Sequence, residues 1–213
     1  ATLAAAAGTS TAAVIRLANR MGYGGYTELR LSLAQEVFST GTNEKQANLG
    51  EINESTPAGD IVKILVGMTT DSMAGVETVL DRTSLERAVE TIMKSHHVMV
   101  AGIGASGIVA TDFQQKLARL GLLAVYTADS DMQVVQACAL KPEDCLVAIS
   151  YSGETGSIIK AAREGRRNGA PILAVTRIGG NSLSKLADII LTVPNSESLF
   201  RQGASLSRIN QLL

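Results

Sequence analysis

The stretch ISYSGETG, residues 149–156, carries residue types that bind anions. It follows an apolar run and offers the hydroxyl groups of Ser150, Ser152 and Thr155. Gly153 lets a ligand approach the backbone closely, and a helix beginning near Thr155 would present free N–H groups with a partial positive charge. Together these features predict a phosphate-binding turn between a strand and a helix.

A second glycine-rich stretch, GIGASG at residues 102–107, has the same character. It is a glycine-rich turn into a helix, and Ser106 supplies a further hydroxyl donor. The sequence shows no clear acidic partner for a ribose, so NAD binding is not expected and no cofactor is predicted. The alternative for both stretches is a tight strand-to-helix turn that needs a glycine and a cap but binds nothing.

The elements that must position these two turns follow from the hydrophobic pattern. From residue 97 onward, short apolar runs alternate with helical stretches, the pattern of βαβ units around a parallel sheet. We expect strands at 97–102, 122–127, 145–150, 171–176 and 189–193, and helices over about 105–120, 130–139, 155–168 and 182–187. Apolar positions at helical spacing predict two more helices across 58–95, with a break near 81–83.

This order predicts an α/β fold with a doubly wound parallel five-stranded sheet. Both glycine-rich stretches then lie at the carboxyl ends of strands, where open parallel sheets bind their ligands. A polar run with a glycine at 39–48 indicates a linker. We therefore divide the chain into a small helical domain at 1–38, a linker at 39–57 and the α/β domain at 58–213.

The small helical domain has the spacing of a helix-turn-helix motif. Ala4 is small where two helices would cross, and Gly8 can adopt the left-handed conformation that ends the first helix. Val14 and Leu17 are expected to face back onto that first helix. The alternative is an alanine-rich helical hairpin without a DNA-binding role.

In the helix-turn-helix interpretation, a serine N-cap starts a second helix over about 11–20. Its early residues would meet base edges, and two arginines about one turn apart would reach bases or phosphates. The residues assigned to the DNA contact are Ser10, Thr11, Ala12, Ala13, Arg16 and Arg20.

Composition limits the functional classes. The net charge of −1 and the pI near 6.2 argue against a protein coated in positive charge, but they allow a small DNA-reading patch. No apolar run is long enough to span a bilayer and the first residues lack the basic start of a secretory signal, so we expect a cytoplasmic protein without a membrane partner. Cys138 and Cys145 lack metal-ligand spacing, so no metal site is predicted and both are expected to be buried reduced thiols.

Three longer runs resemble a known family. Residues 98–126 (VMVAGIGASGIVATDFQQKLARLGLLAVY), 146–176 (LVAISYSGETGSIIKAAREGRRNGAPILAVT) and 181–193 (NSLSKLADIILTV) are similar to a sugar isomerase (SIS) domain, a phosphosugar-binding α/β fold. The segment GYGGYTELRLSLAQEV at 22–37, after the helix-turn-helix, is similar to the N-terminal domain of RpiR-type bacterial transcriptional regulators. Such regulators join that domain to an SIS domain in this order.

The resemblance implies roles for particular residues. The hydroxyl groups of Ser106, Ser150, Ser152 and Thr155 would hold the phosphate of a sugar phosphate, with Gly104 and Gly153 shaping the turns. The segment 196–201 would bring Glu197, and as a further candidate Arg201, to the sugar end of the ligand. The resemblance also implies a homodimer or homotetramer, a chain that begins inside its helix-turn-helix domain, and an end at Leu213 within a closing helical region.

The same fold occurs in aldose-ketose isomerases and in sugar-phosphate lyases or etherases, so the residues must separate regulator from enzyme. An isomerase needs a base beside the carbonyl. His96 and His97 are expected at the amino end of the first strand, away from the ligand turns, and Glu197 is more readily explained as a hydrogen-bond acceptor for sugar hydroxyls. Asp129 and Asp131, near the carboxyl end of the second strand, either line the ligand pocket or, as we expect, are solvated loop acids that cap the next helix.

The sequence therefore predicts a transcriptional regulator that binds operator DNA, responds to a sugar-phosphate effector and performs no catalysis. The first alternative is a sugar-phosphate isomerase or lyase. The second is a phosphosugar-binding protein that acts on another protein. An exposed pair of arginines on a helix-turn-helix favours the regulator, and a helical unit packed onto the α/β domain favours the enzyme.

Overall fold

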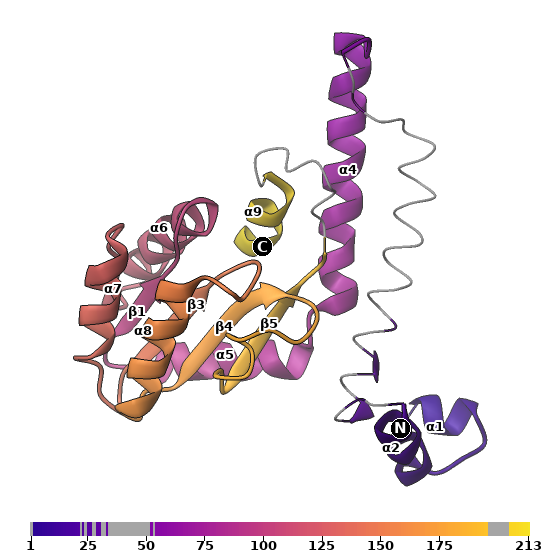
Figure 1. Ribbon diagram of the computed structural model, residues 1–213, viewed down its shortest axis with the longest axis horizontal. Coiled ribbons are helices and arrows are strands. Elements are labelled where there is room, and N and C mark those ends of the chain that lie inside the picture. Colours follow the sequence, from indigo (N-terminus) through magenta and orange to yellow (C-terminus); the bar gives the residue numbers. More distant parts are fainter. Residues whose placement is uncertain are drawn as a thin grey trace.

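A parallel sheet organises the carboxyl-terminal part of the chain (Figure 1). The computed structural model describes residues 2–21, 23, 25, 26, 29, 30, 33, 52, 54–195 and 205–213. The five strands are parallel and lie in the order β2-β1-β3-β4-β5. Their bounds are β1 Val98–Ala101, β2 Ala124–Val125, β3 Cys145–Ile149, β4 Ile172–Arg177 and β5 Ile189–Val193. The predicted sheet is confirmed, with strand ends that differ from the expected ones by at most two residues.

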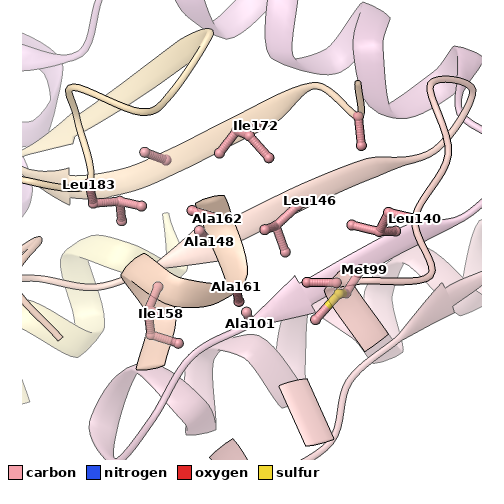
Figure 2. Close-up of a cluster of buried hydrophobic side chains, with 13 residues drawn as sticks. Met99, Ala101, Leu140, Leu146, Ala148, Ile158, Ala161, Ala162, Ile172 and Leu183 are labelled. Carbon is pink, nitrogen blue, oxygen red and sulfur yellow. The ribbon is translucent and has the colours of Figure 1, made fainter. Parts of the chain in front are cut away.

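Helices cover both faces of the sheet, as a doubly wound fold requires. Helices α7 (Ser130–Ala137) and α8 (Gly156–Arg167) cover one face, and α5 (Arg82–Lys94) and α6 (Ala105–Arg119) contribute to the core on the other. Successive strand residues alternate between the two cores because side chains of a strand point to opposite faces in turn. Figure 2 shows the first core, which contains Met99, Ala101, Leu146, Ala148, Ile158, Ala161, Ala162, Ile172 and Leu183. The second contains Val98, Val100, Val109, Cys145, Val147 and Ile149.

One predicted helix is wrong. Residues 182–186 form turns and no helix. Backbone bonds of the helical type begin in this segment, from Lys185 N to the carbonyl of Asn181 at 3.3 Å and from Ala187 N to the carbonyl of Leu183 at 3.2 Å, but they do not continue. Asp188 N instead donates to the carbonyl of Ile172 on β4 at 2.8 Å, so the chain enters β5 before a regular helix is complete.

Two helices flank the sheet at its β5 end. Helix α4 (Ala58–Val79) precedes α5, and the break between them confirms the interruption predicted near 81–83. Helix α9 (Ser205–Leu212) lies between α6 and α4 (Figure 1). Buried hydrogen bonds tie α4 to its neighbours, from Asn210 Nδ2 to Ser72 Oγ at 2.8 Å and from Thr192 Oγ1 to the carbonyl of Val79 at 2.6 Å.

The N-terminal residues form two short helices, α1 (Thr2–Ala6) and α2 (Thr11–Arg20). Gly8 has a φ of 59° between them, and Ser10 caps α2 by accepting a hydrogen bond from Ala13 N at 3.2 Å. Ala4 and Val14 are buried, as expected for a helix-turn-helix.

The expectation for Leu17 is wrong, since this side chain is 54% exposed whereas Ala18 is completely buried. Val14 and Ala18 are four positions apart and share one helix face, whereas Leu17 projects about 60° away from Val14 on an α-helix. The buried face of α2 therefore runs through Val14 and Ala18, and Leu17 lies outside it.

The two cysteines differ in their surroundings. Cys145 is buried in the sheet, but Cys138 is exposed, so the expectation that both thiols are buried is wrong for Cys138. Cys138 follows the last turn of α7, where the chain has left the core. In the part of the chain that the structure describes, no helix is both long and apolar enough to cross a membrane, and no group of metal-ligating side chains occurs.

Candidate functional site

Strands β1 and β3 are neighbours in the sheet, so the two glycine-rich turns that follow them lie side by side at its carboxyl edge. The strand order reverses between these two strands, because the chain proceeds from β1 outward to β2 and from β3 outward to β4 and β5. At such a reversal the connecting helices leave toward opposite faces and open a crevice between them, which is where doubly wound folds bind ligands.

The turn after β3 presents three hydroxyl groups. Ser150 is buried, and its Oγ lies 3.0 Å from Oγ1 of Thr155. Ser152 is exposed and accepts a hydrogen bond from Glu154 N at 3.2 Å, and its hydroxyl proton has no acceptor among the described residues. Thr155 occupies the N-cap position of α8 without making a side-chain cap bond. The N-terminus of α8 therefore keeps N–H groups that no side chain caps, beside all three hydroxyls.

Gly153 is required by the geometry of this turn. Its φ of 67° lies in the left-handed region, and a Cβ at this position would lie 2.0 Å from Oδ1 of Asn181. The Asn181 amide cannot easily move, because its Nδ2 donates to Thr176 Oγ1 at 3.0 Å and to the carbonyl of Gly179 at 3.3 Å. Asn181 thus packs against Gly153 and restricts the conformation of this turn, a role that the sequence did not reveal.

The turn after β1 is packed equally closely. Gly104 has a φ of 61° at the N-cap of α6, again without a side-chain cap. A Cβ on Gly102 would lie 2.6 Å from the carbonyl oxygen of Ser106, and one on Gly107 would lie 2.7 Å from the hydroxyl of Tyr126. The three glycines therefore permit a sharp turn from β1 directly into α6.

The spacing of these glycines, G-x-G-x-x-G, is also that of a dinucleotide-binding turn. The acidic residue that would bind a ribose in such a site follows the next strand. Here Asp129 follows β2 but is engaged as the N-cap of α7, accepting hydrogen bonds from Asp131 N at 2.9 Å and Met132 N at 2.8 Å. The expected capping role of Asp129 is confirmed, and this turn offers its N–H groups and Ser106 without a ribose-binding carboxylate.

Ser106 is buried at the start of α6, and its hydroxyl donates a hydrogen bond to Oε1 of Gln211 at 3.2 Å. Gln211 belongs to α9, which the sequence analysis expected only as part of a closing helical region. Nothing local in the sequence marks Gln211, because its contact is made across 105 positions of the chain. The sequence analysis therefore missed Gln211, although it contacts a proposed ligand residue.

The exposed Glu154 is the carboxylate closest in sequence to the hydroxyl groups of the second turn. Its Oε1 accepts a hydrogen bond from Ser182 N at 2.8 Å. Hydrogen bonds from Ser182, followed by the charges of Lys185 and Arg177, hold the pKa of Glu154 below its usual value. A carboxylate with a lowered pKa is a weak base at neutral pH, so Glu154 is poorly suited to proton abstraction.

The remaining predicted ligand residues, Glu197 and Arg201, lie outside the described residues. The histidines lie where the sequence analysis placed them, at the amino edge of the sheet. His97 directly precedes β1, and its Nδ1 is 2.8 Å from Oδ1 of the buried Asp144. Both histidines line a cavity of about 280 Å³ at that amino edge, whereas the hydroxyl-rich turns lie at the carboxyl edge. Neither histidine of this subunit can act on a ligand bound at those turns.

Asp144 makes a structural contact with a testable pH dependence. Burial favours its neutral form, but hydrogen bonds from His97 and from Lys141 N, together with the charge of His97, outweigh burial and lower the pKa of Asp144. A lowered pKa contributes stability above the unfolded-state pKa of about 3.9, and this contribution is lost as the pH falls through the folded-state pKa.

We therefore expect Asp144→Asn to lower the free energy of unfolding by about 1–3 kcal/mol at pH 7, the cost of disrupting hydrogen bonds to a charged group. The difference from the parent protein should narrow as the pH falls below about 4. Urea unfolding at several pH values from 7 to below 4 measures this difference in the free energy of unfolding. Glu143→Gln is the control, because Glu143 is an exposed neighbouring carboxylate. A pH-independent difference would contradict the assigned cause.

Helix α2 carries the residues assigned to DNA contact. Thr11, Ala12, Arg16 and Arg20 are exposed and Ala13 is half-buried, while Ser10 is the N-cap. Arg16 and Arg20 are four positions apart and therefore lie on one face of the helix. An ion pair at 3.5 Å between Arg30 and Asp81, both partly exposed, links this unit to the α/β part. The exposed side chains of Arg16 and Arg20 are available to a partner.

Comparisons with known proteins define the class and then the family. The model of the SIS domain matches residues 91–213, and the model of the helix-turn-helix domain of the rpiR family matches residues 1–40. The fold, with a strand order that reverses between β1 and β3, is therefore that of an SIS-domain protein with an N-terminal helix-turn-helix domain. The chain belongs to the RpiR family of HTH-type transcriptional regulators, as the sequence predicted.

Individual relatives agree with this assignment. The chain is 32% identical over 210 residues to an uncharacterized HTH-type transcriptional regulator of Caldanaerobacter subterraneus, covering 99% of this chain and 73% of the relative. It is also 32% identical over 211 residues to the HTH-type transcriptional regulator YbbH of Bacillus subtilis, with the same coverage.

Solved structures place the fold in the same group. The Vibrio vulnificus NanR protein complexed with ManNAc-6P matches with a TM-score of 0.69 at 29% identity, covering 99% of this chain and 73% of NanR. A phosphoheptose isomerase from Francisella tularensis matches with a TM-score of 0.62 at 22% identity, covering 73% of this chain and 91% of the isomerase. The second likeness shows a shared fold only, because SIS folds carry both regulatory and catalytic functions.

Proposed function

We propose that the chain is a transcriptional regulator whose DNA binding is controlled by a sugar phosphate bound at the β1–β3 crevice. The observation that carries the proposal is the convergence of four hydroxyl groups on two helix N-termini that no side chain caps. The phosphate ligands are Ser106, Ser150, Ser152 and Thr155, with Gly104 and Gly153 shaping the turns. Glu197 and Arg201 are proposed to meet the sugar.

A phosphate group suits this crevice better than a neutral ligand. Hydroxyl and backbone N–H donors form their strongest hydrogen bonds with charged acceptors, and the helix dipoles of α6 and α8 favour a negative charge. The complex of NanR with ManNAc-6P supports an effector of the sugar-phosphate class. The phosphate then supplies most of the affinity, and the sugar supplies the specificity.

We further propose that the site performs no catalysis. An isomerase needs a base whose pKa lies near the working pH. Among the described residues, the histidines lie at the opposite edge of the sheet and the pKa of Glu154 is lowered. The names of the relatives as transcriptional regulators support the same proposal.

Each of the three segments has a role in this proposed function. Residues 1–38 are proposed as the operator-binding domain, 39–57 as a linker and 58–213 as the effector-binding domain. The intact protein is proposed to be a homodimer or homotetramer, because two symmetric reading heads recognise two half-sites about one helical turn apart. Sedimentation of the intact protein at micromolar concentration tests this assembly, and a strict monomer with and without ligand would contradict it.

Ser152→Ala is the direct test of the proposed ligand site. Thermal-shift screening with ManNAc-6P, glucose 6-phosphate, fructose 6-phosphate and ribose 5-phosphate, each beside its unphosphorylated sugar, first identifies a binding compound. Calorimetry with that compound should then show an affinity about 10- to 150-fold lower for Ser152→Ala, since a hydrogen bond to a charged group contributes about 1.5–3 kcal/mol.

The matched control is Ser95→Ala, which removes a hydroxyl that bonds the carbonyl of Thr91 at the opposite edge of the sheet. It should leave the affinity unchanged. Equal binding of a sugar and its phosphate would contradict the proposed role of the crevice. Turnover of the bound sugar phosphate would contradict the non-catalytic assignment.

A further inference from the structure

Helix α9 is attached to the proposed phosphate site through one amide side chain. Oε1 of Gln211 accepts the hydroxyl hydrogen of Ser106 at 3.2 Å. Nε2 of the same amide is buried and has no acceptor among the described residues. The preceding residue, Asn210, donates from Nδ2 to Ser72 Oγ on α4 at 2.8 Å. One turn of α9 therefore bridges the start of α6 and the middle of α4 (Figure 1).

The Ser106 hydroxyl has a single proton, so it cannot donate to Gln211 and to a phosphate oxygen at the same time. A phosphate oxygen is the stronger acceptor, because hydrogen bonds to charged groups are about twice as strong as neutral ones. A bound phosphate therefore takes the proton of Ser106 and removes the donor from Gln211 Oε1.

The unpartnered amide group then acquires a partner. A buried N–H donor without an acceptor destabilises a protein by about 1–3 kcal/mol, so such groups are uncommon in folded chains. The amide of Gln211 contacts a serine that we propose as a phosphate ligand, and a phosphate there would supply the missing acceptor. On binding, Nε2 gains an acceptor while Oε1 loses the Ser106 donor, and the balance is favourable because the new hydrogen bond goes to a charged group.

We infer that Gln211 is a further effector-binding residue, which donates its side-chain N–H to the phosphate and relays occupancy of the site through α9 to α4. This inference rests on the proposed function. The relay has a physical path, because Gln211 and Asn210 are adjacent in one helix and Asn210 is bonded to α4. Helix α4 in turn begins at Ala58, directly after the segment that joins it to the operator-binding domain.

The decisive variant is Gln211→Glu in the full chain, probed first with inorganic phosphate at constant ionic strength. The carboxylate can still accept the hydrogen bond of Ser106, so the attachment of α9 is kept in the free protein. It has no N–H to donate at neutral pH and it repels an anion. We expect the affinity for phosphate to fall at least tenfold in Gln211→Glu and about three- to tenfold in Gln211→Ala.

Gln115→Ala is the matched control, because Gln115 is an exposed glutamine on α6. Its affinity for phosphate should equal that of the parent protein. Hydrogen exchange followed by mass spectrometry reads the relay: phosphate should change the exchange of residues 58–79 in the parent protein and in Gln115→Ala, but not in Gln211→Ala. A helix that is merely structural would not show this difference.

Two failures are distinguishable. If Gln211→Glu and Gln211→Ala bind phosphate as tightly as the parent protein while Ser152→Ala binds more weakly, the inference about Gln211 is wrong and the proposed function stands. If the parent protein responds neither to inorganic phosphate nor to any of the four sugar phosphates, the proposed function itself is wrong, and the inference falls with it. An unchanged exchange of α4 in the parent protein on saturation would overturn the relay.

Discussion

Gly153→Ala is expected to weaken effector binding on the order of 100-fold while leaving the protein folded. An alanine at a φ of 67° costs about 1–2 kcal/mol, because the left-handed region is unfavourable for residues with a Cβ. The Cβ would also lie 2.1 Å from Cγ of Asn181, a buried side chain whose amide is held by hydrogen bonds to Thr176, Gly179 and Ser184. Either the turn or Asn181 must move, and each hydrogen bond that is lost adds about 1 kcal/mol.

The total of about 3 kcal/mol or more corresponds to a loss of affinity on the order of 100-fold, if the turn rearranges to relieve the strain. Calorimetry with the compound identified by thermal-shift screening measures the affinity, and circular dichroism confirms the fold. Gly180→Ala is the control, because Gly180 lies in a neighbouring loop with open space around its Cβ position and without a positive φ. Affinity of Gly153→Ala within threefold of the parent protein would show that the shape of this turn does not control binding.

The sheet could be predicted because its strands leave a strong local signal. Strand β3 is buried along its whole length, so its sequence is a continuous apolar run, and the glycines that end it mark the turn. The placement of the hydroxyl groups then followed from the rule for carboxyl ends of parallel strands. In the same way, Ser10 and Asp129 were predictable as helix caps, because a cap bonds to backbone groups a few residues ahead.

Features that depend on distant contacts could not be predicted. Asn181 fixes the turn at Gly153 from a distant place in the sequence, and an asparagine followed by serine and leucine looks locally like the start of a helix. Gln211 contacts Ser106 only because α9 crosses to α6. The prediction for Leu17 was wrong for a related reason, because spacing places Leu17 close to the buried face of α2 but contacts between helices decide which side chains are covered. Local patterns therefore located the hydroxyl groups of the site, and the fold supplied the residues that support them.

Substitutions in the effector site and in the operator-binding helix should each lower one affinity and leave the other unchanged. Nothing on helix α2 contributes to the hydroxyl-rich crevice among the described residues, and the side chains of Arg16 and Arg20 are exposed. A regulator needs the two sites to be coupled through differences between conformations and not through shared side chains. A substitution on α2 therefore tests DNA binding alone, and one at Gly153 tests effector binding alone.

Arg16→Ala is accordingly expected to weaken operator binding by about 5- to 150-fold, the loss of about 1–3 kcal/mol from one arginine contact. The probe is a labelled duplex selected by the parent protein from a random pool, and fluorescence anisotropy measures its affinity. If Arg16 contacts a phosphate, the loss of affinity is similar for all DNA sequences and the slope of log affinity against log salt concentration falls by about one. If Arg16 contacts a base, discrimination between bases at that position is lost.

Arg163→Ala, which replaces an exposed arginine on α8, is the control and should bind the duplex as the parent protein does. Because Arg16 lies outside the crevice, the affinity for the sugar phosphate should be unchanged. Parent-like operator affinity in both Arg16→Ala and Arg20→Ala would exclude this face of α2 as the reading surface, since an exposed arginine that contacts a phosphate or a base cannot be removed without cost.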